Sequence, residues 1–223
     1  MADEAKLRVL GIAGSLRAGS FNRALLRAAQ ELAPEGMEIR AFDIAEIPLY
    51  NGDVEARGDP EPVAALKTAI READALLIAT PEYNYGVPGV LKNAIDWASR
   101  PPDKTPLRGK PAAIMGASPG AMGTARAQLQ LRQAFVFTHT LAMPGPELLV
   151  ARAHEKFDKD GRLTDEATRG YVRKLLEALR DWTLRLRPPH PTLSPKGERE
   201  TMPPAGASAA RRPGCRRARP SGS

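Results

Sequence analysis

Three short segments combine glycines with polar or aromatic side chains, and each follows an apolar run that predicts a buried strand. They are residues 14–22 (GSLRAGSFN), 81–86 (PEYNYG) and 118–123 (SPGAMG). In the first segment, small residues let backbone N–H groups converge on an anion, while Ser15, Ser20 and Asn22 add side-chain donors. Arg17 adds a charged contact. The segment predicts a phosphate-binding loop; the alternative is an ordinary turn in which Ser20 or Asn22 caps a helix.

The second segment places polar and aromatic groups where a simple solvent-exposed turn would suffice. Tyr83 and Tyr85 could flank a planar heteroaromatic ring, and Gly86 would let the backbone approach it closely. The alternative is that these tyrosines pack against a neighbouring helix or a partner subunit. The third segment, 118–123, has little side-chain bulk and could border the same ring or simply begin a helix.

Neither of two better-known phosphate motifs fits the first segment. Gly14 and Gly19 resemble the start of a Walker A loop, but the lysine before the hydroxyl residue is missing. A dinucleotide fingerprint that begins at Gly11 would need glycines where Ala13 and Leu16 stand. Together with the two other segments, these mismatches favour a mononucleotide with a flat ring, a flavin, over a nucleoside triphosphate or a dinucleotide.

The three segments contain no His, no Cys and no pair of carboxylates that would serve as an obligatory acid or base. The single cysteine, Cys215, lies near the C-terminal end, which excludes an internal disulfide and a thiol nucleophile in the globular part. No set of residues has the spacing of metal ligands. We therefore predict no catalytic side chain and no metal, and expect a cofactor to carry the chemistry.

The elements that must position these segments alternate between strand and helix. The expected strands are 7–13, 37–44, 75–80, 111–117 and 141–143, and the expected helices lie at 23–33, around 63–70, at 89–99, 120–137 and 171–186. This alternation predicts an α/β fold with a parallel sheet between two helical layers. In such a sheet, ligands bind beyond the carboxyl ends of the strands, where all three segments fall.

The charge of the chain is concentrated at its C-terminal end. Eight Lys/Arg and two Asp/Glu in residues 187–223 give that stretch a net charge of +6, which leaves +1 of the total of +7 for residues 1–186. The stretch is rich in Pro, Arg, Ser and Gly, so it predicts a disordered tail after a single domain at 1–186. The favoured interpretation is an extension without a function rather than a nucleic-acid-binding arm, because the tail has no aromatic residue for base stacking and no recognisable motif for nucleic-acid recognition.

No apolar run approaches the roughly 20 residues of a membrane span, and the acidic start does not resemble a signal peptide, so we expect a cytoplasmic protein.

The segments GSLRAGSFN, PEYNYGVPGVLKNAIDWASR and GTARAQLQLRQ resemble the NADPH-dependent FMN reductase family, and within it the chromate and quinone reductase branch. The resemblance covers roughly residues 6–186. It implies a flavodoxin-like three-layer sandwich with five parallel strands in the order 2-1-3-4-5, and FMN as the cofactor. The residues it implies around FMN are Ser15, Arg17, Ser20, Phe21, Asn22, Pro81, Glu82, Tyr83, Asn84, Tyr85, Gly86, Ser118, Gly120 and Gly123.

The resemblance also implies homodimers or homotetramers, with Tyr85, Arg126 and Glu147 linked across a subunit interface. Leu129 stands where the branch has a tyrosine, so this chain departs from the full interface network of the branch at that position. The function implied is reduction of quinones, chromate, azo compounds or flavins with NADPH or NADH by a ping-pong hydride mechanism. The alternatives are a flavodoxin-type electron carrier without its own NAD(P)H turnover, and a noncatalytic binding module recruited by the basic tail.

Overall fold

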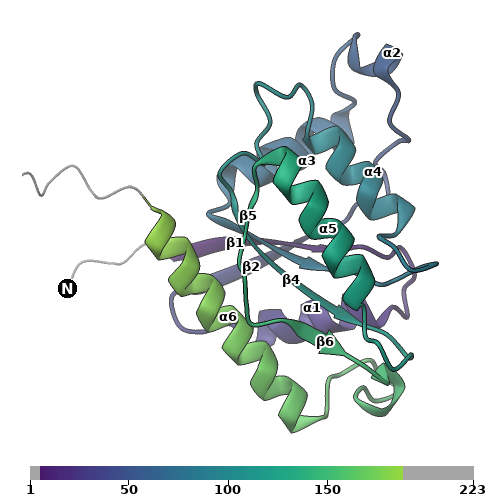
Figure 1. Cartoon of the computed structure of the whole chain (residues 1–223), viewed down its shortest axis with the longest axis vertical. Coiled ribbons are helices and arrows are strands. Elements are labelled where there is room, and N and C mark those ends of the chain that lie inside the picture. The colour runs from purple at the N-terminus through teal and green to yellow at the C-terminus, as the bar shows by residue number, and fades with distance from the viewer. Residues whose placement is uncertain (1–5, 188–223) are drawn as a thin grey trace, which may run out of the picture. The chain divides into compact units, whose positions relative to one another are not determined.

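A computed structural model describes residues 6–187, and its centre is a sheet in which every strand pair is parallel. The strands are β1 (Leu7–Ala13), β2 (Met37–Phe42), β3 (Ala75–Ala79), β4 (Pro111–Ala117), β5 (Leu141–Ala142) and β6 (Leu148–Val150). They follow the order β2-β1-β3-β4-β5, with β6 also paired to β4 (Figure 1). The predicted flavodoxin-like strand order is therefore confirmed.

The fifth position of the sheet is filled by two short strands rather than one. β5 pairs with Pro111 and Ala112 at the start of β4, whereas β6 pairs with the last three residues, 115–117. Pro144 and Pro146 separate the two, and proline cannot donate to a strand ladder. The sequence predicted β5 but not β6, which carries the sheet edge toward the carboxyl ends.

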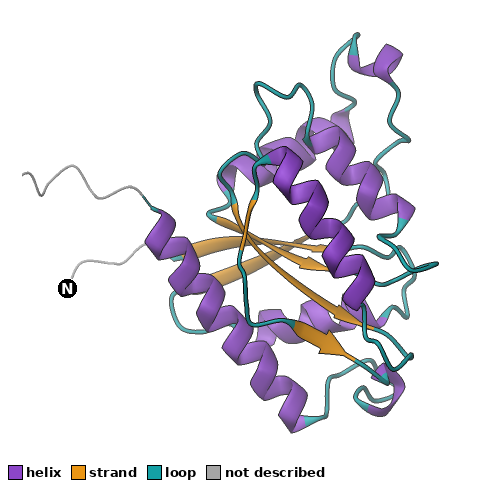
Figure 2. Cartoon of the chain, in the orientation of Figure 1, coloured by secondary structure: helices purple, strands orange, loops and turns teal. Residues whose placement is uncertain are grey.

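Two layers of helices cover the sheet (Figure 2). The helices are α1 (Phe21–Glu31), α2 (Gly52–Glu55), α3 (Glu61–Glu72), α4 (Gly89–Ala98), α5 (Ala125–Thr138), the 3-10 helix η1 (Ala153–Glu155) and α6 (Glu166–Leu186). Leucines and alanines of α1 and α6 pack on one face of the sheet, and apolar residues of α3, α4 and α5 pack on the other. All residues of β3 and β4 are buried, as a parallel strand covered on both faces requires.

Several boundaries differ from the sequence-based expectation; α6, for example, begins at Glu166 rather than 171. α1 begins two residues earlier, at Phe21, because the Ser20 hydroxyl accepts from the N–H groups of Asn22 and Arg23 as an N-cap. α5 begins at Ala125 rather than 120, after Gly123 turns the chain with a φ of +59°. The short helix α2 lies in the stretch expected to be a long loop. The predicted tail beyond Arg187 lies outside the described residues.

Candidate functional site

The three predicted segments meet at the carboxyl edge of the sheet. A backbone hydrogen bond to the neighbouring strand lies at the start of each or directly before it: Gly14 N to Ala79 O, Thr80 N to Met115 O, and Ser118 N to Val150 O, each at 2.9 Å. In Figure 1 this edge lies to the right, where the strand arrows point. The strand order thus places together segments that lie up to about a hundred residues apart in the sequence.

The first loop holds a group of unused backbone donors. Within residues 6–187, the N–H groups of residues 15–19 donate no hydrogen bond to another group of the chain. They precede the N-terminus of α1, whose dipole favours an anion there. Ser20 accepts two bonds as the cap of α1, yet its own hydroxyl proton stays available to donate. The geometry fits a bound phosphate.

Other side chains of the first loop already have partners. Asn22 is 2% exposed, and its carboxamide donates to Ala117 O at 2.8 Å and accepts from Ala117 N at 2.9 Å. It joins α1 to the end of β4. Arg17 donates to Gly19 O at 3.0 Å, and the Phe21 ring packs against Phe157 with centroids 5.5 Å apart. Their predicted contacts with a cofactor stay predictions.

A cavity of about 220 Å³ adjoins the first loop on the side of β2, lined by Ser15, Arg23, Arg27 and Asp43 among others. Arg23 pairs with Asp43 across it at 3.2 Å. No residue of 81–86 or 118–123 lines this cavity. It therefore lies beside the phosphate loop and apart from the place predicted for a ring.

The loop after β3 is a two-residue hairpin. Tyr83 N donates to Gly86 O at 3.1 Å and Gly86 N to Tyr83 O at 3.0 Å. The central residues, Asn84 and Tyr85, have φ of +50° and +65°, the left-handed values of a type I′ turn. A tyrosine rarely adopts this conformation, which costs about 1–3 kcal/mol where the surroundings enforce it. Tyr85 is 72% exposed, whereas Tyr83 is 49% exposed and its hydroxyl lies 3.4 Å from the Ser15 hydroxyl of the first loop.

Two residues of α5 hold this hairpin. Gln130 accepts from Val87 N at 2.6 Å, and a Cβ on Gly86 would lie 2.7 Å from the same Gln130 Oε1. The Arg126 guanidinium lies 3.7 Å from the centre of the Tyr85 ring. A side chain at 86 would therefore have to displace the end of Gln130 from its contact with Val87, a constraint that the sequence position did not reveal.

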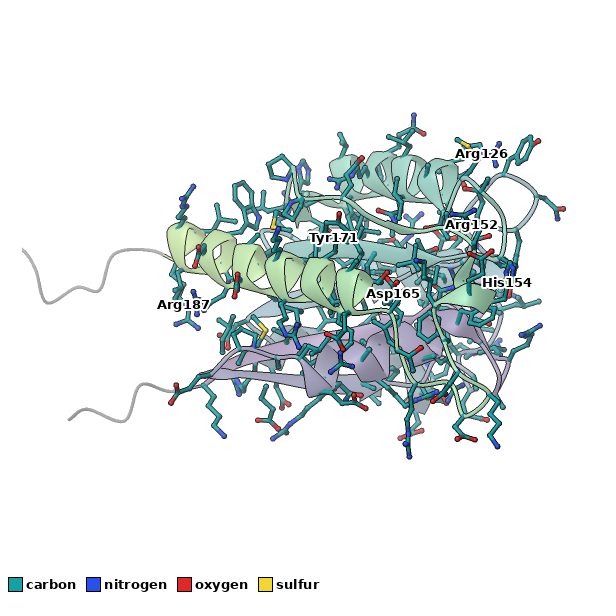
Figure 3. All side chains as sticks on the ribbon, turned by 90° about the horizontal axis from the view of Figure 1, so that it is seen from below. Arg126, Arg152, His154, Asp165, Tyr171 and Arg187 are labelled. Carbon is teal, nitrogen blue, oxygen red and sulfur yellow. The ribbon has the colours of Figure 1, made fainter. Side chains whose placement is uncertain are left out.

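Glu82 faces α5 rather than the open edge. Its carboxylate accepts from Arg126 Nε at 2.6 Å, Arg126 N at 2.9 Å and Ala127 N at 3.2 Å, and its side chain is 7% exposed. Figure 3 shows Arg126 at the end of the molecule that also carries Arg152 and His154, opposite Arg187. Glu147, the predicted third member of an interface network, is exposed. Within residues 6–187, no ion pair joins it to Arg126.

The third loop turns tightly beside η1. The Ser118 hydroxyl accepts from Gly120 N at 3.1 Å, and Ala153 N donates to Ser118 O at 2.9 Å. A Cβ on Gly123 would lie 3.0 Å from Leu149 Cβ. Residue 123 therefore has to be small, because Leu149 of β6 packs directly against it. The loop places Gly120 and the exposed side chain of Met122 near the carboxyl edge, and the predicted contact of Ser118, Gly120 and Gly123 with a ring stays a prediction.

Sequence reasoning missed the residue that sets the distance between β4 and α5. Thr124 is fully buried just before α5, and a Cβ on Gly116 would collide with its hydroxyl and lie 2.5 Å from Thr80 O. A glycine inside a strand often marks such a close approach, so Gly116 was the available signal. The sequence analysis did not single out Thr124, which is the N-cap residue of α5, or Gln130, which lies in the first half of that helix and holds the hairpin.

The strongest pKa shift lies outside the three loops. Hydrogen bonds from Thr168, with a further one from Lys156, lower the pKa of Asp165 to about 2. Asp165 is the N-cap of α6, so this shift belongs to the helix start. Burial lowers the pKa of Lys110, which donates to the carbonyl oxygen of Ala73. These shifts belong to the scaffold and do not indicate a second catalytic centre.

Residues 7–155 match the family model described as NADPH-dependent FMN reductase. The chain belongs to the NADPH-dependent FMN reductase family. The matched range contains all three loops, and the predicted family is confirmed. The protein is thus an enzyme, an oxidoreductase of this family.

Relatives within the reductase family match over most of their length. A protein of Pseudomonas aeruginosa named NAD(P)H-dependent FMN reductase is 54% identical over 187 residues, 84% of this chain and 100% of its own. A quinone reductase of Escherichia coli K12 is 45% identical over 185 residues, 82% of this chain and 98% of its own. Among solved structures, FerB of Paracoccus denitrificans, described as a flavoenzyme NAD(P)H:(acceptor) oxidoreductase, has a TM-score of 0.74 at 40% identity. The match covers 80% of this chain and 97% of that one.

Proposed function

We propose that the protein binds FMN at the carboxyl edge of the sheet and uses NADPH or NADH to reduce small acceptors such as quinones, chromate, azo compounds or flavins. The observation that carries the proposal is the set of unused N–H donors at residues 15–19, beside the N-terminus of α1. They can hold a phosphate without any lysine, because several hydrogen bonds to an anion outweigh the helix dipole.

The residues present fit the two ends of FMN. The phosphate would lie on the backbone of 15–19, with Ser15, Ser20 and Arg17 as further donors. The ring would lie against the hairpin 81–86 and the third loop, in which only the Ser118 hydroxyl lies near the place of a Cβ on Gly120. The hairpin offers the faces and edges of two exposed tyrosines for stacking.

Bound FMN would supply the hydride and electron chemistry, and the chain supplies binding and orientation. None of the histidines or cysteines lies in the three loops, so we assign no side chain as acid or base. Both the tyrosine hairpin and the third loop face an open edge, which leaves space for a nicotinamide and then for an acceptor at one place. Parallel lines in a double-reciprocal analysis, the ping-pong pattern, are expected from this arrangement.

A quinone is the first acceptor to test. The quinone reductases of Escherichia coli and the NAD(P)H:quinone oxidoreductase of Solanum tuberosum, 45% and 44% identical to this chain, support this choice. The same relatives favour a reductase over an electron carrier without NAD(P)H turnover. The two differ in a direct measurement: steady oxidation of NADPH by the purified protein with a quinone supports the reductase, and none would support the carrier.

We infer that the protein forms homodimers or homotetramers, with Tyr85, Arg126 and Glu147 near the interface. The outer surface of α5 supports this inference, since it exposes Leu129, Val136 and Phe137 by 59%, 77% and 70%. Apolar side chains that repeat at this spacing form a stripe along a helix, which a monomer would leave in water. Leu129 adds apolar area to the stripe in place of the hydroxyl that a tyrosine would bring.

The location proposed is the cytoplasm. Among the helices of residues 6–187, none combines the length and apolar character needed to cross a membrane.

The basic tail proposed from the sequence, residues 187–223, is assigned no role in FMN binding, because the three loops lie between residues 14 and 123.

A further inference from the structure

The hairpin 83–86 is strained and needs support from outside itself. Its two central residues, Asn84 and Tyr85, both have positive φ, although neither is glycine. The two hydrogen bonds between Tyr83 and Gly86 close the turn but do not fix its direction relative to the sheet. Support comes from α5, where Arg126 and Gln130, four residues apart and so on one face of the helix, both contact the hairpin region.

Arg126 is in turn held by Glu82. The guanidinium lies between the Glu82 carboxylate, 2.6 Å from Nε to Oε1, and the Tyr85 ring, 3.7 Å from Cζ to the ring centre. The second carboxylate oxygen accepts from the N–H groups of Arg126 and Ala127, which begin α5. Glu82 therefore fixes both the start of the helix and the direction of its arginine.

This arrangement leaves Glu82 little capacity for a direct cofactor contact. Its side chain is 7% exposed, and its two oxygens receive three hydrogen bonds from α5. Arg126, with 38% of its side chain exposed, and Tyr85 are the members of the group that reach the open edge. A planar guanidinium can meet the carboxylate along its edge and the ring with its face, which an ammonium cannot do.

We propose that Glu82 is a positioning residue: it acts through Arg126 and Tyr85 to hold the hairpin in the conformation that lines the flavin ring. The inference rests on the proposed function, since the ring it positions for is that of FMN. It assigns to Glu82 a role within one subunit, separate from the interface contacts implied for Arg126.

The test is a double-mutant cycle on the dissociation constant of FMN, measured by fluorescence titration of the apoprotein. Glu82→Gln keeps the shape of the side chain and removes its charge, and Arg126→Met keeps the length and removes the guanidinium. Each is expected to weaken FMN binding by about tenfold. The double variant is expected to bind within about threefold of the weaker single variant, because residues acting in one chain of contacts are not additive.

Effects that multiply to about a hundredfold would overturn the proposal, since Glu82 would then act independently of Arg126. An unchanged affinity of Glu82→Gln would overturn it too. The matched control is Glu38→Gln on β2, where Glu38 Oε1 lies 2.8 Å from Arg40 Nε in the same type of contact. That variant should bind FMN as the wild type does.

A further variant keeps the test decisive if Glu82→Gln fails to fold. Arg126→Lys preserves the charge opposite Glu82 and removes the planar group over Tyr85, so it should lose about tenfold in FMN affinity. Wild-type affinity in this variant would overturn the proposal. Failure of the wild-type protein to bind FMN at all would instead overturn the proposed function, and the inference with it.

Discussion

Replacing Asn22 with alanine should destabilise the protein even in the absence of any cofactor. The carboxamide of Asn22 makes two buried hydrogen bonds to the backbone of Ala117, of 2.8 and 2.9 Å. Its removal leaves a buried N–H and a buried C=O without these partners, at about 1–3 kcal/mol each. We therefore expect a loss of roughly 2–6 kcal/mol, because water does not readily reach a site where the side chain was 2% exposed.

The assay is urea unfolding of the FMN-free protein, followed by circular dichroism, with thermal unfolding as a second measure. For a domain of this size the midpoint temperature should fall by about 2–4 °C for each kcal/mol lost. Asn93→Ala is the matched control, since Asn93 also accepts from one backbone N–H and donates to one carbonyl, both at 2.8 Å, but at a more exposed position. Water can replace these bonds, so the control should lose about 1–2 kcal/mol.

An Asn22→Ala variant within about 0.5 kcal/mol of the wild type would refute this reasoning. If that variant also bound FMN weakly, Asn22 would be a phosphate ligand, as the sequence alone suggested. The structural role predicts the opposite pattern, with a large loss of stability before any FMN is added.

Three further outcomes are expected. Gly116→Ala should destabilise by at least about 1–3 kcal/mol in the same unfolding assay, since the new methyl group would collide with Thr124; wild-type stability would contradict the packing of β4 on α5. The lowered pKa of Asp165, about 2, means that its contacts stabilise the fold fully above about pH 4 and lose this effect as the pH falls toward 2. Asp165→Asn should flatten the dependence of the urea midpoint on pH in that window, and an unchanged slope would exclude the Thr168 contacts as its source. Deleting residues 188–223 should leave FMN content and NADPH turnover unchanged, and a colourless truncated protein would assign the tail a role.

The sequence predicted the architecture well because the signals are local. Apolar runs such as 75–79 identify buried parallel strands, and strand-helix alternation fixes where their carboxyl ends lie. The positions of the three loops followed from this. β6 was missed because two prolines interrupt the periodic pattern that would reveal it. The start of α5 was placed five residues too early, because the positive φ of Gly123 is a turn that the pattern does not show.

The partners of individual side chains could not be predicted in the same way. Asn22 meets Ala117 across 95 positions, and Glu82 meets Arg126 across 44. Both residues stand in motifs that suggest cofactor contacts, yet their polar atoms are used to join loops to α1, β4 and α5. Only the packing of the complete sheet brings such groups together, so a motif can identify a site without giving the role of each residue in it.

The absorption spectrum of the purified protein, before and after NADPH, tests the central claim most directly. Bound FMN should give bands at about 370 and about 450 nm, and NADPH in the absence of oxygen should bleach the longer-wavelength band until a quinone restores it. A protein that is colourless, takes up no added FMN and leaves NADPH unoxidised would contradict the account.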